Sequence, residues 1–221
     1  MTRKIVGLAA VLVVATLASV SAWVALSLPG DVQLPIHWGL DGEADGFSNK
    51  WTALIMPPLI TACASLFFFF LPALEPRKEG LERSQGLYLW GWIASLQLGA
   101  AIELAVVSDA LGLGLPVNRV IIGSIGGSLV LLGNQFGKSR SMYLMGLRTP
   151  WTLASEDVWI RTHRLAGKLM VLAGLVVIAA ALLPLPPSVL MRLMLGAVVA
   201  MALVPIVYSY LLWRREGQAS E

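Results

Sequence analysis

Six long apolar segments alternate with shorter polar ones along this 221-residue chain. The apolar segments run over residues 5–28, 51–74, 85–107, 116–133, 163–184 and 188–213. A helix rises about 1.5 Å per residue, so each segment is long enough to cross a hydrocarbon layer of roughly 30 Å. Backbone groups in lipid need hydrogen-bond partners within their own segment, so we expect six transmembrane helices. The pattern predicts an all-α integral membrane protein built as a six-helix bundle.

The composition agrees with lipid as the main solvent of this chain. Hydrophobic residues make up 57% of it, charged residues only 13%, and the mean hydropathy is +0.76. In an ordinary soluble domain, charged residues make up about a quarter. The single cysteine, Cys63, lies inside an apolar segment and has no partner for an intramolecular disulfide. Residues 18–22 resemble a signal-peptidase site, but the apolar run continues through Leu28, which favours a membrane anchor over a cleaved signal.

The positive charges are distributed unevenly between the two ends of these segments. All Lys and Arg residues fall on the side of the two termini, except Lys50, Arg119 and Arg192. Loops rich in Lys and Arg stay in the cytoplasm, so we expect both termini there. The net charge of +3 and the pI near 9.2 then reflect membrane topology, and no direct nucleic-acid partner is indicated.

The first connection, residues 29–50, collects polar chemistry that the membrane segments lack. It belongs to a predicted N-terminal two-helix unit, residues 1–74, and faces outward in this topology. Two interpretations stay open. Glycine turns, with Lys50 neutralising acidic charge, would make it a purely structural loop; alternatively, its acidic and aromatic side chains recognise a cationic or amphipathic peptide. The candidate ligand-binding residues are His37, Trp38, Asp41, Glu43, Asp45 and Lys50.

The same connection carries no complete metal motif. Asp41 to Gly46 resembles the start of a calcium-binding loop, but Thr52 stands where the closing glutamate is needed. His37 has no second histidine at zinc-binding spacing, and His163 falls on the other side of the membrane. Nucleotide, haem and flavin motifs are also missing from the sequence, so we predict no metal and no other cofactor.

The longest cytoplasmic connection, residues 134–162, is the second candidate site. It lies in a predicted four-helix region, residues 75–221. Ser155 followed by two acidic residues is typical of a helix N-terminus, so we expect the fifth membrane helix to begin in the cytoplasm. Trp159 and His163 then share one face of that helix. His163 has no serine or cysteine at catalytic spacing, and we predict no enzyme.

Few polar side chains interrupt the membrane segments. Glu103 either reaches the outer interface and meets a cation there, which we favour, or marks a functional site inside the membrane. Gln97 lies deeper and is expected to form an inter-helix hydrogen bond. Gly123 and Gly127 have the spacing that lets helices approach closely, which we interpret as packing within one bundle.

Both polar connections resemble a known family of bacterial membrane proteins. The cytoplasmic one resembles the signature of the SdpI family, and its candidate structural or docking residues are Arg148, Thr149, Pro150, Trp151, Glu156, Trp159, His163 and Arg164. The segment from Leu34 to Trp38, with Gly42 and Lys50, is similar to the small domain of unknown function that commonly precedes this signature. One departure is Gln135, where proline usually follows the asparagine.

The resemblance implies an immunity protein of the bacterial cytoplasmic membrane. The founding member of the family protects its bacterium from a secreted, membrane-active peptide toxin and also draws a small transcriptional repressor to the membrane when the toxin is present, whereas many relatives occur without the toxin system. The expected partners are therefore the lipid bilayer, a peptide toxin outside and a repressor inside. Two alternatives are a small-solute or ion transporter, or a membrane-embedded enzyme, that uses Glu103, His37 or His163. A third is a structural subunit of a larger membrane complex.

Overall fold

The computed structural model describes residues 2–39 and 41–219. Within these residues, six helices are long and apolar enough to cross a membrane. They are α1 (Arg3–Ser27), α2 (Lys50–Leu74), α4 (Gln85–Ala110), α5 (Val117–Phe136), α7 (Glu156–Leu182) and α8 (Pro187–Ala219). The connections contain two short helices and two strands, α3 (Lys78–Glu82), α6 (Pro150–Ala154), β1 (Gln33–Trp38) and β2 (Ala44–Asn49). The predicted helical membrane protein is confirmed.

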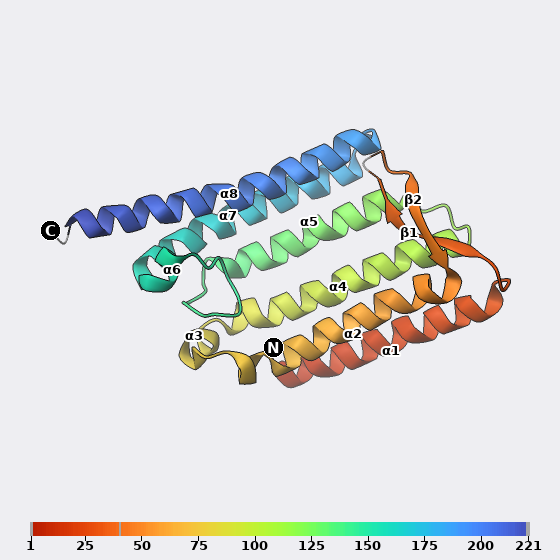
Figure 1. Ribbon diagram of the computed structural model, residues 1–221, viewed down its shortest axis with the longest axis horizontal. Coiled ribbons are helices and arrows are strands. Elements are labelled where there is room, and N and C mark those ends of the chain that lie inside the picture. The colour runs from red at the N-terminus through yellow and green to blue at the C-terminus, as the bar shows by residue number, and fades with distance from the viewer. Residues whose placement is uncertain (1, 40, 220–221) are drawn as a thin grey trace.

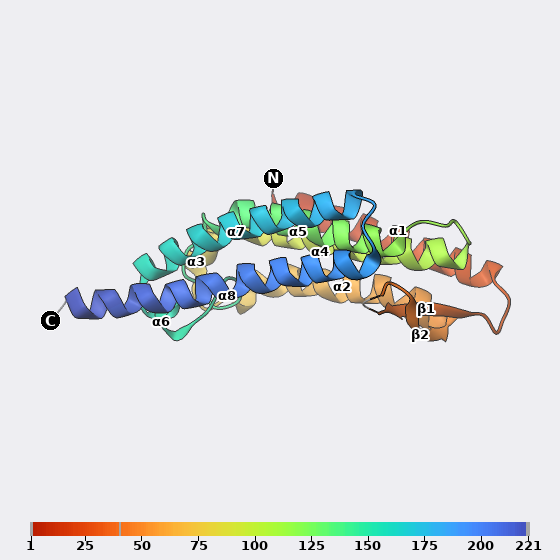
Figure 2. The same ribbon diagram turned by 90° about the horizontal axis from the view of Figure 1, so that it is seen from above.

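The six long helices run along one axis of the molecule (Figure 1). The two strands lie at one end of the bundle, whereas α3, α6 and both ends of the described chain lie at the other (Figure 1). Seen from above, the bundle is elongated and shallow (Figure 2). The two polar connections predicted as candidate sites therefore lie at opposite ends.

The helices form one continuous bundle. α4 packs against α1, α2 and α5, and α7 packs between α5 and α8. The two units predicted from sequence, residues 1–74 and 75–221, thus share a packed interface. Leucines such as Leu8, Leu59 and Leu172 are exposed on the outside of the bundle, which is the arrangement expected where lipid is the solvent.

The backbones of α5 and α7 approach each other at two glycine pairs. A Cβ atom added to Gly126 would lie 2.9 Å from the carbonyl oxygen of Gly174, and one added to Gly133 would lie 2.8 Å from that of Gly167. Small residues of α5 therefore do serve packing within one bundle, as predicted. The closest contacts, however, lie at these pairs and not at Gly123 and Gly127, the pair that the sequence spacing had indicated.

Within the first connection, residues 33–49 fold into a β-hairpin, which the sequence analysis did not predict. β1 and β2 are antiparallel, with Gln33 opposite Asn49 and Trp38 opposite Ala44. Glycine and aspartate are disfavoured in strands, so the composition of this segment argued against them. Burial of Leu34 in the core that lines this end of the bundle offsets that cost. Leu40, within the predicted loop, lies outside the described residues.

Candidate functional site

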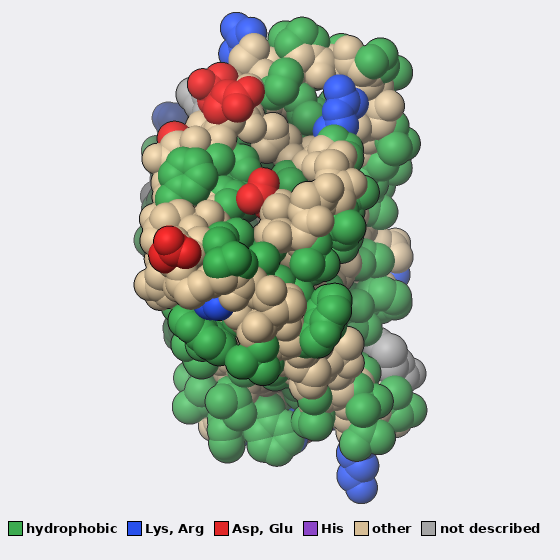
Figure 3. Space-filling view, turned by 90° about the vertical axis from the view of Figure 1, so that its right-hand side faces the viewer, with side chains coloured by type: hydrophobic (Ala, Val, Ile, Leu, Met, Phe, Trp, Pro, Cys, Tyr) green, Lys and Arg blue, Asp and Glu red, His purple; other side chains and the backbone are tan. Residues whose placement is uncertain are grey.

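The hairpin presents an exposed acidic surface at its end of the bundle. His37, Asp41, Glu43 and Asp45 are all exposed, and the His37 Nδ1 atom lies 2.5 Å from Asp45 Oδ1. Figure 3 looks onto this end and shows acidic side chains among large hydrophobic patches. The structure thus brings together four of the six candidate residues of the first connection. Among the described residues, no group of three or more His, Cys, Asp or Glu side chains is arranged to hold a metal ion. We name these four residues the acidic hairpin surface.

The tip of the hairpin is anchored to the bundle. The Asn118 side-chain amide, at the start of α5, donates a 2.9 Å hydrogen bond to the Gly42 carbonyl oxygen. Gly42 has a φ of +85°, and a Cβ atom there would lie 2.2 Å from the Asn118 amide nitrogen, so only glycine fits. Asp41 Oδ1 accepts a hydrogen bond from the Glu43 backbone N–H at 3.1 Å. These contacts fix the acidic side chains relative to the helices.

The other two candidates of this connection are not on that surface. Lys50 is only 6% exposed, and its ammonium group donates a 2.5 Å hydrogen bond to the Leu28 carbonyl oxygen at the end of α1. The prediction that Lys50 neutralises the acidic cluster is therefore wrong: its long apolar stem permits burial, and a helix C-terminus supplies the acceptor. Trp38 is half-buried and packs against the core formed with Val24 and Leu54.

Exposed apolar side chains flank the acidic ones. Ile36, Phe47 and Trp51 are 49%, 58% and 45% exposed, respectively. Ile36 and Phe47 belong to β1 and β2, and Trp51 to the first turn of α2. The end of the protein that carries the hairpin is thus acidic and apolar at once, which suits a partner with both cationic and hydrophobic groups.

At the opposite end, the signature histidine is fully enclosed. The ring of His163 stacks on Trp159 at a centroid distance of 3.9 Å and on Phe136 at 4.8 Å. Its Nε2 atom accepts a hydrogen bond from the Leu147 backbone N–H at 2.9 Å, so its Nδ1–H donates to the Trp159 carbonyl oxygen, also at 2.9 Å. Both ring nitrogens are therefore engaged, and His163 acts as a packing and hydrogen-bonding centre for the loop.

The glycine and threonine positions of the signature have a structural explanation. Gly146 has a φ of +109°, and a Cβ atom there would lie 2.8 Å from His163 Nε2. Thr149 and Thr152 form a reciprocal capping box at the start of α6, where Pro150 occupies the first turn. The chain thus turns sharply at Gly146, which places the Leu147 backbone N–H within hydrogen-bonding distance of His163 Nε2.

The tryptophan and charged positions of the signature connect it to its neighbours. Trp151 Nε1–H donates a 2.5 Å hydrogen bond to Ser209 Oγ of α8, and its ring packs against Tyr210 at 5.4 Å. Arg148 donates a 2.5 Å hydrogen bond to the Tyr143 carbonyl oxygen. Glu156 lies 3.9 Å from Arg140, and Arg164 is exposed.

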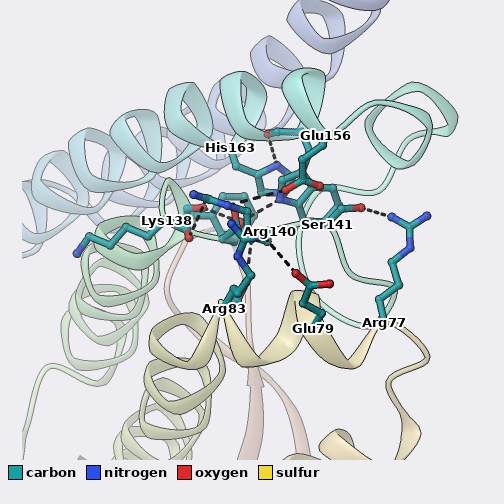
Figure 4. A network of polar contacts seen from close by, with 12 residues as sticks. Arg77, Glu79, Arg83, Lys138, Arg140, Ser141, Glu156 and His163 are labelled. Carbon is teal, nitrogen blue, oxygen red and sulfur yellow. Dashed lines mark hydrogen bonds and ion pairs between the residues drawn. The ribbon is translucent and has the colours of Figure 1, made fainter.

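A second anchor for this loop was missed by the sequence analysis. Glu75, directly after α2, is 1% exposed, and its carboxylate accepts hydrogen bonds from the backbone N–H groups of Arg77, Tyr143 and Leu144 at 3.0, 2.9 and 2.8 Å. The Arg77 guanidinium donates to Ser141 Oγ and lies over the Tyr143 ring. Figure 4 shows Arg77 and Ser141 meeting beside Arg140 and Glu156. The sequence did contain a signal for this anchor, namely an acidic residue at the very end of an apolar segment.

Of the two polar residues singled out inside the membrane helices, Gln97 is half-buried and Glu103 is buried. Gln97 donates to Ser124 Oγ at 2.8 Å and accepts from Ser128 Oγ at 3.2 Å, which confirms the expected inter-helix hydrogen bond. Glu103 is 2% exposed and accepts a 2.5 Å hydrogen bond from Ser21 of α1. The favoured interfacial position is therefore wrong.

Arg119 and Arg192, the cations expected near Glu103, have other partners. Arg119 donates to the Ala181 and Leu185 carbonyl oxygens, and Arg192 donates to that of Ser188. These acceptors lie at the end of α7, in the connection after it and at the start of α8, whereas Glu103 is bonded to Ser21 of α1. Glu103 thus serves as a polar contact between α1 and α4.

Comparison with known proteins gives both polar connections a family context. The family described as the SdpI/YfhL protein family matches residues 138–209, and the Domain of unknown function (DUF1648) matches residues 11–61. The chain is also 27% identical over 145 residues to Immunity protein SdpI from Bacillus subtilis (strain 168), an alignment that covers 66% of this chain and 67% of that protein. No solved structure matches the chain. Two family matches thus lie on one six-helix bundle: residues 138–209 are similar to the SdpI/YfhL protein family, and residues 11–61 are similar to DUF1648.

Proposed function

We propose that this protein confers immunity in the bacterial cytoplasmic membrane by binding a secreted, membrane-active peptide toxin at the acidic hairpin surface. The similarity to Immunity protein SdpI supports the immunity role in this proposal. The arrangement of His37, Asp41, Glu43 and Asp45 supports the site, because a peptide that attacks anionic membranes is rich in cationic and apolar groups. The anchored hairpin would meet such a peptide before it inserts.

The proposal requires the hairpin to face the outside of the cell. The excess of Lys and Arg at the opposite end supports this orientation. A cysteine replacing Glu43, in a Cys63→Ser background, is expected to react with a membrane-impermeant maleimide in intact cells. A cysteine replacing Glu79, which is exposed at the other end, is expected to react only after permeabilisation. Labelling in the reverse order would refute the orientation and with it the binding site.

The acidic side chains are expected to be needed for protection. A triple variant, Asp41→Asn, Glu43→Gln and Asp45→Asn, keeps the size and shape of the three side chains but removes their negative charges. We expect a sensitive host that expresses it to tolerate about ten-fold less cationic peptide than one that expresses the parent, since each contact of this kind contributes about 1 kcal/mol or less. The measurement is growth across a peptide dilution series, with the amount of protein in the membrane determined in parallel.

The matched control places charge changes at the other end of the bundle. Glu82→Gln with Asp157→Asn alters two exposed acids far from the hairpin, and protection is expected to be unchanged. If the triple variant protects as well as the parent at equal protein level, the acidic hairpin surface is not the toxin-binding site.

We further propose that the opposite end can recruit a repressor protein. The segment that follows α5 is held in one conformation by His163 and Glu75, and exposed cations such as Arg83 and Arg164 lie beside it. No catalytic role is assigned to this arrangement. The transporter and enzyme alternatives gain no support from Glu103 or His163, since both side chains are enclosed by packed helices.

A further inference from the structure

A long groove runs along the outside of the bundle between α1 and α2. Its volume is about 1140 Å³, and Trp92 of α4 forms part of its wall. Along α1 its lining extends from Thr2 to Ala18, a length of roughly 24 Å at 1.5 Å per residue. One leaflet of a bilayer, with its headgroups, is about 20–22 Å thick. The groove therefore extends through one leaflet, on the side of the N-terminus.

Two cations stand at the mouth of this groove. Arg3 and Lys4 both line it, and in the described part of the chain neither has an ion-pair partner. The Arg3 guanidinium is held in place by a 2.5 Å hydrogen bond to the Phe69 carbonyl oxygen and lies 4.8 Å from the centre of the Phe69 ring. Its remaining N–H groups and the Lys4 ammonium are suited to a phosphate group.

Two buried polar groups in the wall lack partners. Ser65 and Trp92 are 8% and 1% exposed, and neither Ser65 Oγ nor Trp92 Nε1 has a hydrogen-bond partner. The Cη2 corner of the Trp92 ring lies beside Gly7, which is one helical turn below Arg3. In a phospholipid, the ester carbonyl groups lie just below the phosphate. An acceptor is what an indole N–H needs, and a serine hydroxyl can use one as well.

We propose that the α1–α2 groove binds one anionic phospholipid of the leaflet on the N-terminal side. Its phosphate lies at Arg3 and Lys4, its ester carbonyl groups lie at the level of Ser65 and Trp92, and an acyl chain follows α1 toward Ala18. The site is independent of the acidic hairpin surface, which lies at the other end of α1.

The test measures lipid retained by the purified full-length protein in detergent. The protein is incubated with phosphatidylglycerol, with phosphatidylcholine of the same chains, or with the ether-linked analogue of phosphatidylglycerol, and bound lipid is counted by native mass spectrometry. We expect one phosphatidylglycerol per chain, about ten-fold weaker retention of phosphatidylcholine, and about five-fold weaker retention of the ether lipid, which lacks the carbonyl acceptors.

Variants assign the binding to the groove. Arg3→Gln with Lys4→Gln is expected to weaken phosphatidylglycerol retention about twenty-fold, and Trp92→Phe with Ser65→Ala about five-fold. Trp23→Phe with Ser19→Ala is the matched control, because both residues are exposed on α1 and line no part of the groove. Arg3 and Lys4 are exposed, so we expect their variant to fold and to remain informative if the buried pair does not.

Three results would overturn the proposal. One is equal retention of the three lipids, which would indicate surrounding lipid only. Another is unchanged retention in the Arg3 and Lys4 variant. The last is a dimer whose mass persists without bound lipid, which would mean that a second copy of the chain covers the groove.

Discussion

Replacing Gly174 with alanine is expected to lower the free energy of unfolding by about 3 kcal/mol. The added Cβ would lie 2.6 Å from the Gly126 carbonyl oxygen and 2.9 Å from the backbone nitrogen of Val130, and backbone atoms of a packed helix cannot move aside without separating α5 from α7. The loss exceeds the roughly 1 kcal/mol that alanine gains over glycine in a helix. Unfolding in mixed detergent micelles, followed by circular dichroism, measures the difference.

Gly196→Ala is the matched control for this prediction. Gly196 is also in a membrane helix, but a Cβ atom there would meet nothing within 4 Å. We expect this variant to be as stable as the parent or slightly more stable. Equal stability of the two alanine variants would mean that the α5–α7 contact is looser than the structure has it.

The second large effect is expected at Glu75. Glu75→Gln keeps the size of the side chain but turns an NH₂ group toward one of the two backbone N–H donors at Tyr143 and Leu144. A buried donor then loses its acceptor, and we expect a loss of about 2–3 kcal/mol of local stability. Hydrogen exchange at these two amides is the direct measurement, and the exchange rate is expected to rise by about 30- to 150-fold.

Glu79→Gln provides the comparison for Glu75. The Glu79 side chain is exposed and lies 3.3 Å from Arg83, the residue that follows α3, and such a surface pair contributes little. Its variant is expected to leave exchange at Tyr143 and Leu144 unchanged. If both variants leave exchange unchanged, the local stability of the segment carrying Tyr143 and Leu144 does not depend on the Glu75 carboxylate.

The sequence alone was sufficient for the membrane helices. Lipid requires each crossing segment to be long, apolar and internally hydrogen-bonded, so the six spans could be found without knowing what packs against what. The start of α7 at Glu156 was also predictable, since Ser155 caps it through the Val158 backbone N–H. Local rules of this kind depend only on neighbours in the chain.

The roles of single polar residues depended on the tertiary structure. Lys50 and Glu103 were both predicted at an aqueous surface, and each is buried with a partner far away in sequence, Leu28 and Ser21, respectively. The α5–α7 contact, likewise, uses the glycines that happen to face each other. Which groups meet across the bundle is set by the rotation and depth of whole helices, which a helical pattern leaves open.

What the sequence determined, then, is that this chain crosses a membrane as six helices with polar chemistry confined to the two ends, because the solvation of backbone and charge in lipid permits little else. Only the tertiary structure decided that residues 33–38 and 44–49 pair as strands and that Glu75 holds the segment carrying Tyr143 and Leu144. Both depend on hydrogen bonds between segments distant in the chain, and such bonds form only once the helices have brought their ends together.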